Sequence, residues 1–208
     1  MSLQIDSLED YHKAYQASVE NPSKFWDEIA EKFFWRKKWT QTLDYNWNVP
    51  ETKWFLEGKL NITENCLDRH LASKGDQTAI IWEPNDPKDP AQHITYKQLH
   101  SKVCAFANVL RNNGVVKGDR VCVYMPMVAE LAVAVLACAR IGAIHSVVFA
   151  GFSSRALSAR INDAECKVLL TSDGGFRGDK VTPLKDIADE ALKTCPSIKK
   201  SIVFQRTQ

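Results

Sequence analysis

The sequence lacks an excess of either charge and any long apolar run. Its 27 Lys and Arg residues nearly balance 25 Asp and Glu residues, which leaves a net charge of +2. Nucleic-acid and membrane-surface partners usually require a clustered basic excess, so we expect neither partner. A membrane-spanning helix needs roughly 18 consecutive apolar residues, whereas the run from Leu131 ends at Arg140. The start of the chain shows no basic segment followed by an apolar one, so we expect no secretory signal and a cytoplasmic location.

Closely spaced cysteine pairs are also absent. No two of the six cysteines form a Cys-x-x-Cys pair, and they are spread along the chain at Cys66, Cys104, Cys122, Cys138, Cys166 and Cys195. Zinc sites need clustered ligands, and disulfide frameworks belong to secreted chains. The sequence therefore predicts reduced and mostly buried thiols.

The common nucleotide-binding and catalytic signatures are missing as well. The chain contains no Gly-x-Gly-x-x-Gly, and none of its glycine-rich stretches ends in Gly-Lys-Ser or Gly-Lys-Thr. This excludes the dinucleotide fingerprint and the P-loop. We also find no Ser-His-Asp arrangement and no metal-ligand cluster in the sequence. Residue patterns by themselves thus assign no reaction and no catalytic residue.

A strand–helix–strand unit lies at the centre of the chain. Residues 121–125 are apolar and rich in β-branched side chains, and Pro126 ends this predicted strand. Residues 128–140 form a strongly apolar predicted helix, and Gly142 supplies a stop before a second strand at 146–149. A helix this apolar must be covered on most sides, so the unit belongs inside a larger α/β body.

The alternation of strands and helices continues to the last residues. Helices are expected from Ser153 or Ser154 to 161 and over 184–193, and strands over 168–171 and 201–204. Upstream, strands at 79–82 and 93–96 predict a hairpin, followed by a helix that Thr95 and Gln98 begin with a capping box. This order predicts an α/β fold with a mostly parallel sheet and flanking helices.

The first 60 residues differ in composition from the rest. All but one of the six tryptophans lie there, and helices are expected over 9–20 and 22–38, with an irregular segment at 45–59. A tryptophan stripe can bind sugars or bases, but the favoured interpretation is that these rings anchor a helical layer by burying apolar area. We therefore expect a helical, aromatic-rich extension at 1–60 and an incomplete α/β subdomain at 61–208.

A glycine-rich segment follows the predicted strand at 168–171. In open parallel sheets, ligands bind at the carboxyl ends of strands. Gly174, Gly175 and Gly178 would let the backbone approach a ligand closely, and Arg177 and Lys180 place two cations on the same short segment. This combination suits a phosphate group of a nucleotide-like ligand. The alternative is a solvated loop with ordinary surface charges.

Two stretches carry a family resemblance. Residues 54–71 and the block from Tyr124 to Ser153, with Tyr-Met-Pro-Met and Ala-Arg-Ile-Gly-Ala-Ile-His-Ser-Val-Val-Phe-Ala-Gly-Phe-Ser, closely resemble the acetyl-coenzyme A synthetase family. These are AMP-forming acyl-CoA ligases of the adenylate-forming superfamily. The resemblance implies a ligase that uses ATP and Mg²⁺ to convert acetate to acetyl-adenylate and pyrophosphate. It then transfers the acetyl group to coenzyme A.

The resemblance also implies a coenzyme A site in this chain. In that family, basic side chains after the third strand hold the 3′-phosphate and adenine end of coenzyme A, which carries over to Arg177 and Lys180. The family has arginine at the second position, and lysine keeps the charge but loses the planar fork. The family's Phe-Gly-Gly turn that touches coenzyme A falls on Phe149, Ala150 and Gly151.

Several parts of the family's active site do not occur in these 208 residues. They are the Ser/Thr/Gly-rich loop for the ATP phosphates, the acetate pocket, the ribose-binding aspartate and the mobile domain with the catalytic lysine. We therefore expect a piece of an acetate–CoA ligase that is inactive alone. Alternatives are a propionate–CoA ligase of the same superfamily, residual coenzyme A binding only, a purely structural role, and self-association through the aromatic surface or an uncovered sheet edge.

Overall fold

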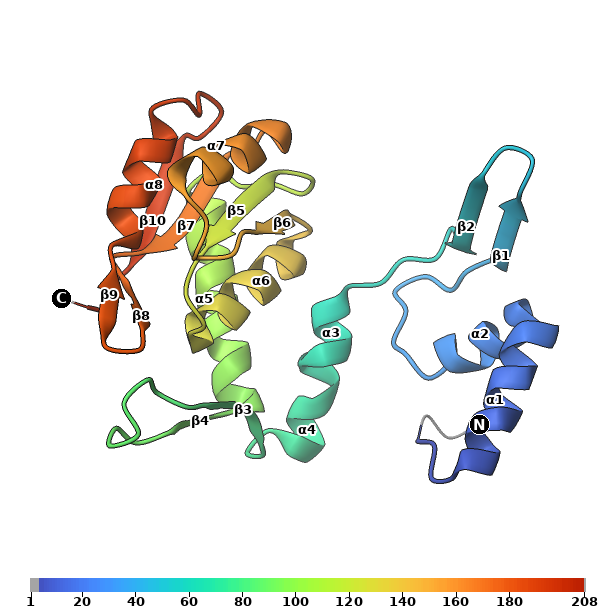
Figure 1. Cartoon of the computed structure of the whole chain (residues 1–208). Helices are drawn as coiled ribbons and strands as arrows, with labels where there is room; N and C mark the ends of the chain where they lie inside the picture. The colour runs from blue at the N-terminus through green and yellow to red at the C-terminus, as the bar shows by residue number, and fades with distance from the viewer. Residues whose placement is uncertain (1–3, 208) are drawn as a thin grey trace. The chain divides into compact units, whose positions relative to one another are not determined.

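The computed structural model describes residues 4–207 and shows two compact units (Figure 1). The boundary between the units lies between Asn65 and Cys66. A boundary near residue 60 was expected from composition, and the structural division lies a few residues further along the chain.

The first unit combines helices with a β-hairpin. Two helices open it, and an antiparallel pair of strands and a short helix follow: α1 (Leu8–Glu20), α2 (Pro22–Ala30), β1 (Gln41–Asn46), β2 (Glu51–Leu56) and α3 (Ile62–Cys66). The expected helix starting at Pro22 is confirmed, and the Asn21 side chain accepts a hydrogen bond from the backbone N–H of Lys24. Its predicted end near residue 38 is wrong, because α2 stops at Ala30.

Aromatic packing explains why the segment after α2 is not helical. The Trp35 ring lies 4.8 Å from the Trp39 ring and 5.3 Å from the Phe55 ring, measured between centroids. Phe55 belongs to β2, so the segment at 45–59, expected to be irregular, is largely a hairpin instead. Tertiary contacts between large rings outweigh local helix propensity here.

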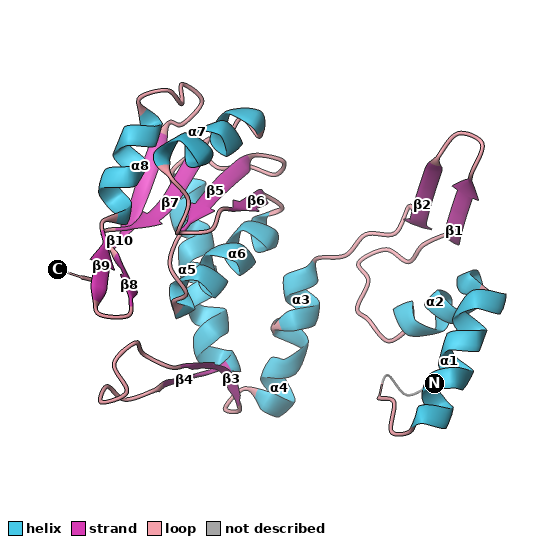
Figure 2. Ribbon diagram, in the orientation of Figure 1, coloured by secondary structure: helices cyan, strands magenta, loops and turns pink. Residues whose placement is uncertain are grey.

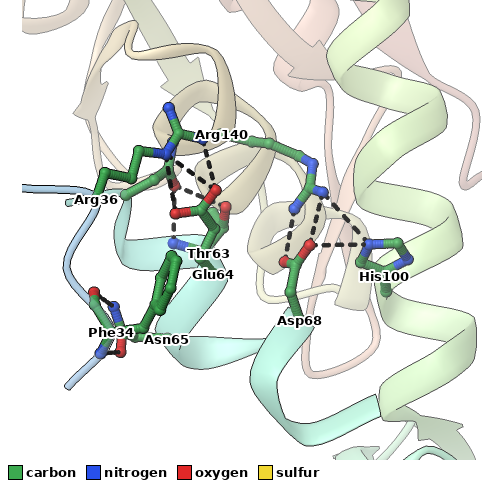
Figure 3. Close-up of polar contacts among 9 residues, drawn as sticks. Phe34, Arg36, Thr63, Glu64, Asn65, Asp68, His100 and Arg140 are labelled. Carbon is green, nitrogen blue, oxygen red and sulfur yellow. Dashed lines mark hydrogen bonds and ion pairs between the residues drawn. The ribbon is translucent and has the colours of Figure 1, made fainter. Parts of the chain in front are cut away.

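The buried Asn65 side chain fixes the end of this unit. Its carbonyl oxygen accepts from the Phe34 N–H at 2.7 Å, and its amide group donates to the Phe34 carbonyl at 2.9 Å (Figure 3). Arg36 and Glu64 form an ion pair beside it. Together these contacts hold α3 against the segment that follows α2.

The second unit contains a four-stranded parallel sheet, which confirms the predicted fold class (Figure 2). The strands run in the order β10–β7–β5–β6, with bounds β5 (Arg120–Tyr124), β6 (Ile144–Val147), β7 (Val168–Ser172) and β10 (Lys200–Phe204). The strand predicted at 146–149 begins earlier, at Ile144, because Gly142 ends the preceding helix in the left-handed region with φ +74°.

Helices cover both faces of this sheet (Figure 1). Side chains of alternate residues along its strands point to the two faces. Val121, Val123 and Leu170 face α5 (Tyr96–Asn112) and α6 (Ala129–Ile141). Cys122, Tyr124 and Leu169 face α7 (Ser154–Asp163) and α8 (Leu184–Leu192). Strand β5 is therefore buried on both sides, as its continuous apolar run predicted.

The remaining elements precede the sheet. They are a 3₁₀ turn (Asp68–His70), the short helix α4 (Leu71–Lys74) and the antiparallel pair β3 (Thr78–Trp82) and β4 (Gln92–Thr95). The hairpin and the Thr95–Gln98 capping box are both confirmed. Asp68 accepts two hydrogen bonds from Arg140 at 2.8 and 2.9 Å, which ties the 3₁₀ turn to α6 (Figure 3).

Candidate functional site

The segment after β7 is a β-hairpin rather than an irregular loop. Strands β8 (Gly175–Arg177) and β9 (Lys180–Thr182) pair antiparallel across a two-residue turn. Gly178 opens that turn with φ +58°, a conformation that favours glycine at the first central position of a hairpin loop. The segment therefore has a defined geometry, with its charged side chains exposed.

This geometry brings together the two cations that the sequence singled out. Arg177 and Lys180 are direct cross-strand partners in the β8–β9 hairpin, and both are exposed. Directly opposed residues of an antiparallel pair project to the same face. Like charges directly opposite each other destabilise such a pair. A bound anion would remove this repulsion, so the hairpin is suited to a phosphate group.

The three glycines of this segment have different roles. A Cβ at Gly174 would lie 2.8 Å from Oγ1 of Thr207, and one at Gly175 would lie 3.2 Å from Pro126. Both glycines are buried, so the expectation that they let a ligand approach the backbone is wrong. They allow close packing within the protein instead. Gly178 is exposed, and a Cβ there would meet nothing within 4 Å, so its backbone is open to a ligand.

Asp173 anchors the hairpin to the segment that follows β10. Its carboxylate accepts hydrogen bonds from the backbone N–H groups of Gly174 at 2.7 Å, Arg206 at 2.8 Å and Thr207 at 2.9 Å. Burial acts to raise the pKa of Asp173, but the N–H groups of Thr207, Arg206 and Gly174 outweigh it and hold the pKa well below its ordinary value. The carboxylate is therefore ionised at neutral pH.

The turn after β6 carries the other predicted coenzyme A residues. Phe149 is 69% exposed, and its ring lies 5.8 Å from the Phe152 ring. The buried Tyr124 hydroxyl donates to the Ala150 carbonyl at 3.2 Å and to the Phe152 carbonyl at 2.8 Å, which fixes the turn to the end of β5. A Cβ at Gly151 would overlap the exposed Phe149 ring, so a larger residue there would require that ring to move.

Alanine at position 150 is compatible with this turn. Among the described residues, the non-glycine positions with positive φ are Phe55, Glu57 and Glu165, so Ala150 does not occupy the left-handed region. The departure from the family's Phe-Gly-Gly pattern therefore introduces no backbone strain. The turn follows β6 and the hairpin follows β7, and both lie at the carboxyl edge of the sheet.

A polar cleft of about 640 Å³ lies beside the hairpin, on the side of Phe176. Arg206 lines it, with its guanidinium 5.2 Å from the Phe176 ring centroid and 5.8 Å from that of Trp82. The Asn85 side chain donates to the Gly178 carbonyl at 3.0 Å and so contacts the hairpin turn. Side chains alternate along β8, so Arg177 projects away from Phe176 and from this cleft.

Sequence reasoning missed Asp173, Asn85 and Arg206. An aspartate directly after a buried strand is a weak signal for a role at the carboxyl edge. Two of the partners of Asp173, Arg206 and Thr207, lie more than 30 positions along the chain, so no local pattern could identify them. Residues 4–207 contain no group of three or more His, Cys, Asp or Glu side chains that could hold a metal ion. No helix in the described part of the chain is long and apolar enough to cross a membrane.

Comparisons with known proteins match almost the whole chain. The family model "AMP-binding enzyme" matches residues 67–208, and the model "Acetyl-coenzyme A synthetase N-terminus" matches residues 11–66. An acetyl-coenzyme A synthetase of Alkalilimnicola ehrlichii is 52% identical over 198 residues, covering 95% of this chain and 30% of the relative. Acetyl-coenzyme A synthetase 2 of Pseudomonas aeruginosa is 51% identical over 201 residues, covering 96% of this chain and 31% of the relative.

A solved structure shows the same fold. Acetoacetyl-CoA synthetase from Streptomyces lividans superimposes with a TM-score of 0.84 at 27% sequence identity, over 90% of this chain and 29% of that one. The chain thus spans about 30% of the length of the curated relatives it matches.

Proposed function

The chain belongs to the family of AMP-binding enzymes, and from that premise we propose that it forms the coenzyme A-facing part of an acetate–CoA ligase. The complete reaction would join acetate to ATP as acetyl-adenylate with release of pyrophosphate. It would then transfer the acetyl group to the thiol of coenzyme A with release of AMP. The relatives described above are acetyl-coenzyme A synthetases, which favours acetate over propionate as the substrate.

The observation that supports this proposal most directly is the pair of cations on the β8–β9 hairpin. Arg177 and Lys180 face each other on the exposed hairpin at the carboxyl edge of the sheet. In this role the Arg177 guanidinium holds the 3′-phosphate of coenzyme A with its planar fork, and Lys180 adds a point charge. The open backbone at Gly178 allows the phosphate to approach the turn.

The turn after β6 supplies an apolar contact in the same proposal. The exposed ring of Phe149 offers a flat surface to coenzyme A, while Tyr124 holds the carbonyls of Ala150 and Phe152 in place. Gly151 keeps the backbone close to that ring. This chain would therefore bind and orient the thiol substrate.

ATP and Mg²⁺ would serve the first half-reaction. Residues 4–207 contain no group of three or more His, Cys, Asp or Glu side chains that could hold a metal ion, and Mg²⁺ in phosphate-using sites is held largely through the substrate phosphates. The sequence also has no glycine-rich loop of the kind that cradles ATP phosphates in this family. We assign neither group to this chain.

Titration calorimetry with coenzyme A and with dephospho-coenzyme A tests the proposal. Two charge-assisted contacts of about 1.5 kcal/mol each predict a preference of roughly a hundredfold for coenzyme A. The preference should decrease as salt rises, because the contacts are exposed. Equal affinity for the two ligands, or no detectable heat with either, would count against the site.

The 208 residues alone are expected to support no adenylation. They lack the loop and the acetate pocket that the first half-reaction needs in this family. We expect no acetate-dependent exchange of labelled pyrophosphate into ATP above the rate measured without protein. Acetate-dependent pyrophosphate exchange by this chain would refute the prediction that these 208 residues cannot adenylate acetate.

Location and assembly belong to the same proposal. Six free cysteines are typical of a reducing compartment, which supports a cytoplasmic protein. Small-molecule substrates are the only partners that the proposed function requires. Self-association through the exposed rings of the first unit or through an edge strand stays a prediction.

A further inference from the structure

We propose that Asp173 is a positioning residue that fixes the hairpin on which Arg177 and Lys180 meet the 3′-phosphate. The inference rests on the proposed coenzyme A site and deepens it. Asp173 touches no ligand in this proposal and acts only through the backbone of the hairpin and of residues 206–207.

The contacts of Asp173 connect three segments of the chain. Its backbone N–H donates to the Phe204 carbonyl at 3.0 Å, and its own carbonyl accepts from the Lys185 N–H at 3.2 Å. Its carboxylate binds the N–H groups of Gly174, Arg206 and Thr207. This single residue therefore ties the base of the hairpin to the end of β10 and the start of α8.

The hairpin needs such an anchor because it is small and carries opposed like charges. Strands of three residues form a pair that is marginal without tertiary support. Repulsion between Arg177 and Lys180 adds to that weakness. The contact from Asn85 to the Gly178 carbonyl supports the turn, and Asp173 supports the other end.

The sign of the change in phosphate affinity after removal of the Asp173 charge distinguishes a positioning role from a purely electrostatic one. An anionic residue near two cations lowers their affinity for another anion, so removing its charge should raise phosphate affinity. If Asp173 positions the cations, removing its charge should lower phosphate affinity instead. Asparagine cannot replace it fully, since the amide nitrogen donates and cannot accept from a backbone N–H.

Asp173→Asn is the test variant, and Asp179→Asn is the matched control. Asp179 is an exposed carboxylate within the hairpin turn itself. We measure affinity for coenzyme A and dephospho-coenzyme A by calorimetry on the full chain, with thermal unfolding to confirm folding. The preference for coenzyme A is expected to fall by about fivefold or more in Asp173→Asn, as for the loss of a charge-assisted contact. In Asp179→Asn it should stay equal or rise.

A second variant covers the case in which Asp173→Asn fails to fold. Thr207→Pro removes the N–H and the side-chain hydroxyl that donate to Asp173, at a position outside the sheet, and leaves the carboxylate in place. We expect it to lower the preference in the same direction by a smaller factor. If the unsubstituted chain prefers coenzyme A and both variants keep that preference, the inference is overturned while the proposed function stands. If the unsubstituted chain shows no preference, the proposed function has failed, and the inference fails with it.

Discussion

Replacing both Arg177 and Lys180 by alanine is expected to reduce the affinity for coenzyme A to that for dephospho-coenzyme A. The two side chains lie opposite each other and supply the cationic groups of the proposed phosphate site. Charge-assisted contacts of about 1.5 kcal/mol each correspond to roughly a hundredfold loss for the pair. Calorimetric titration with both ligands measures this change, and the affinity for dephospho-coenzyme A should stay the same.

Single substitutions and a matched control make the result specific. Arg177→Lys keeps the charge but loses the fork, and Lys180→Arg restores the fork that the family resemblance implies at that position. We therefore expect weaker binding in the first variant and tighter binding in the second. Lys193→Ala removes an exposed lysine that is paired with Glu190 on α8, and it should change neither affinity. A hundredfold loss in that control would show that general charge, and not the hairpin, determines binding.

Leu169→Ala is expected to cause the largest loss of stability among the changes considered. Leu169 is fully buried in β7 and packs in the core that α7 and α8 cover. Large-to-small changes at such positions cost about 2–5 kcal/mol, because they remove apolar contacts and leave a cavity. For a protein of this size the midpoint of thermal unfolding should fall by roughly 4–20 °C.

The control for this variant is Ile81→Ala. Ile81 lies in β3 and is 60% exposed, so truncation should change the free energy of unfolding by less than about 0.5 kcal/mol. Chemical denaturation of the two variants measures both values. A loss at Leu169 no larger than that at Ile81 would contradict the two-sided burial of the sheet described above.

The sequence was most informative where local patterns and burial agree. The continuous apolar run of β5 and the glycine that ends α6 are both local signals, and the structure confirms them. The Thr95–Gln98 capping box is equally local, because the two residues bond to each other's backbone. Such features depend on neighbours in sequence, so they can be predicted without knowledge of the fold.

Predictions failed where distant residues determine the structure. The helix from Pro22 ends at Ala30 because Trp35, Trp39 and Phe55 pack together, and Phe55 is remote in sequence. In the candidate site, Arg177 and Lys180 were identified from their place on one short segment. The hairpin that places them directly opposite each other was not expected. The role of Asp173 depends on residues 206 and 207, which no local pattern connects to it.

The cysteines of the second unit differ in exposure, so their reactivity with a thiol reagent reports whether this unit is folded. Cys66 is exposed, whereas Cys122, Cys138, Cys166 and Cys195 are buried. Burial raises the pKa of the Cys138 thiol to about 12, so it stays protonated and unreactive at neutral pH. An alkylating reagent applied to the intact protein would mark Cys66 first, and labelling of the interior sulfurs would report how often the sheet and its helices separate.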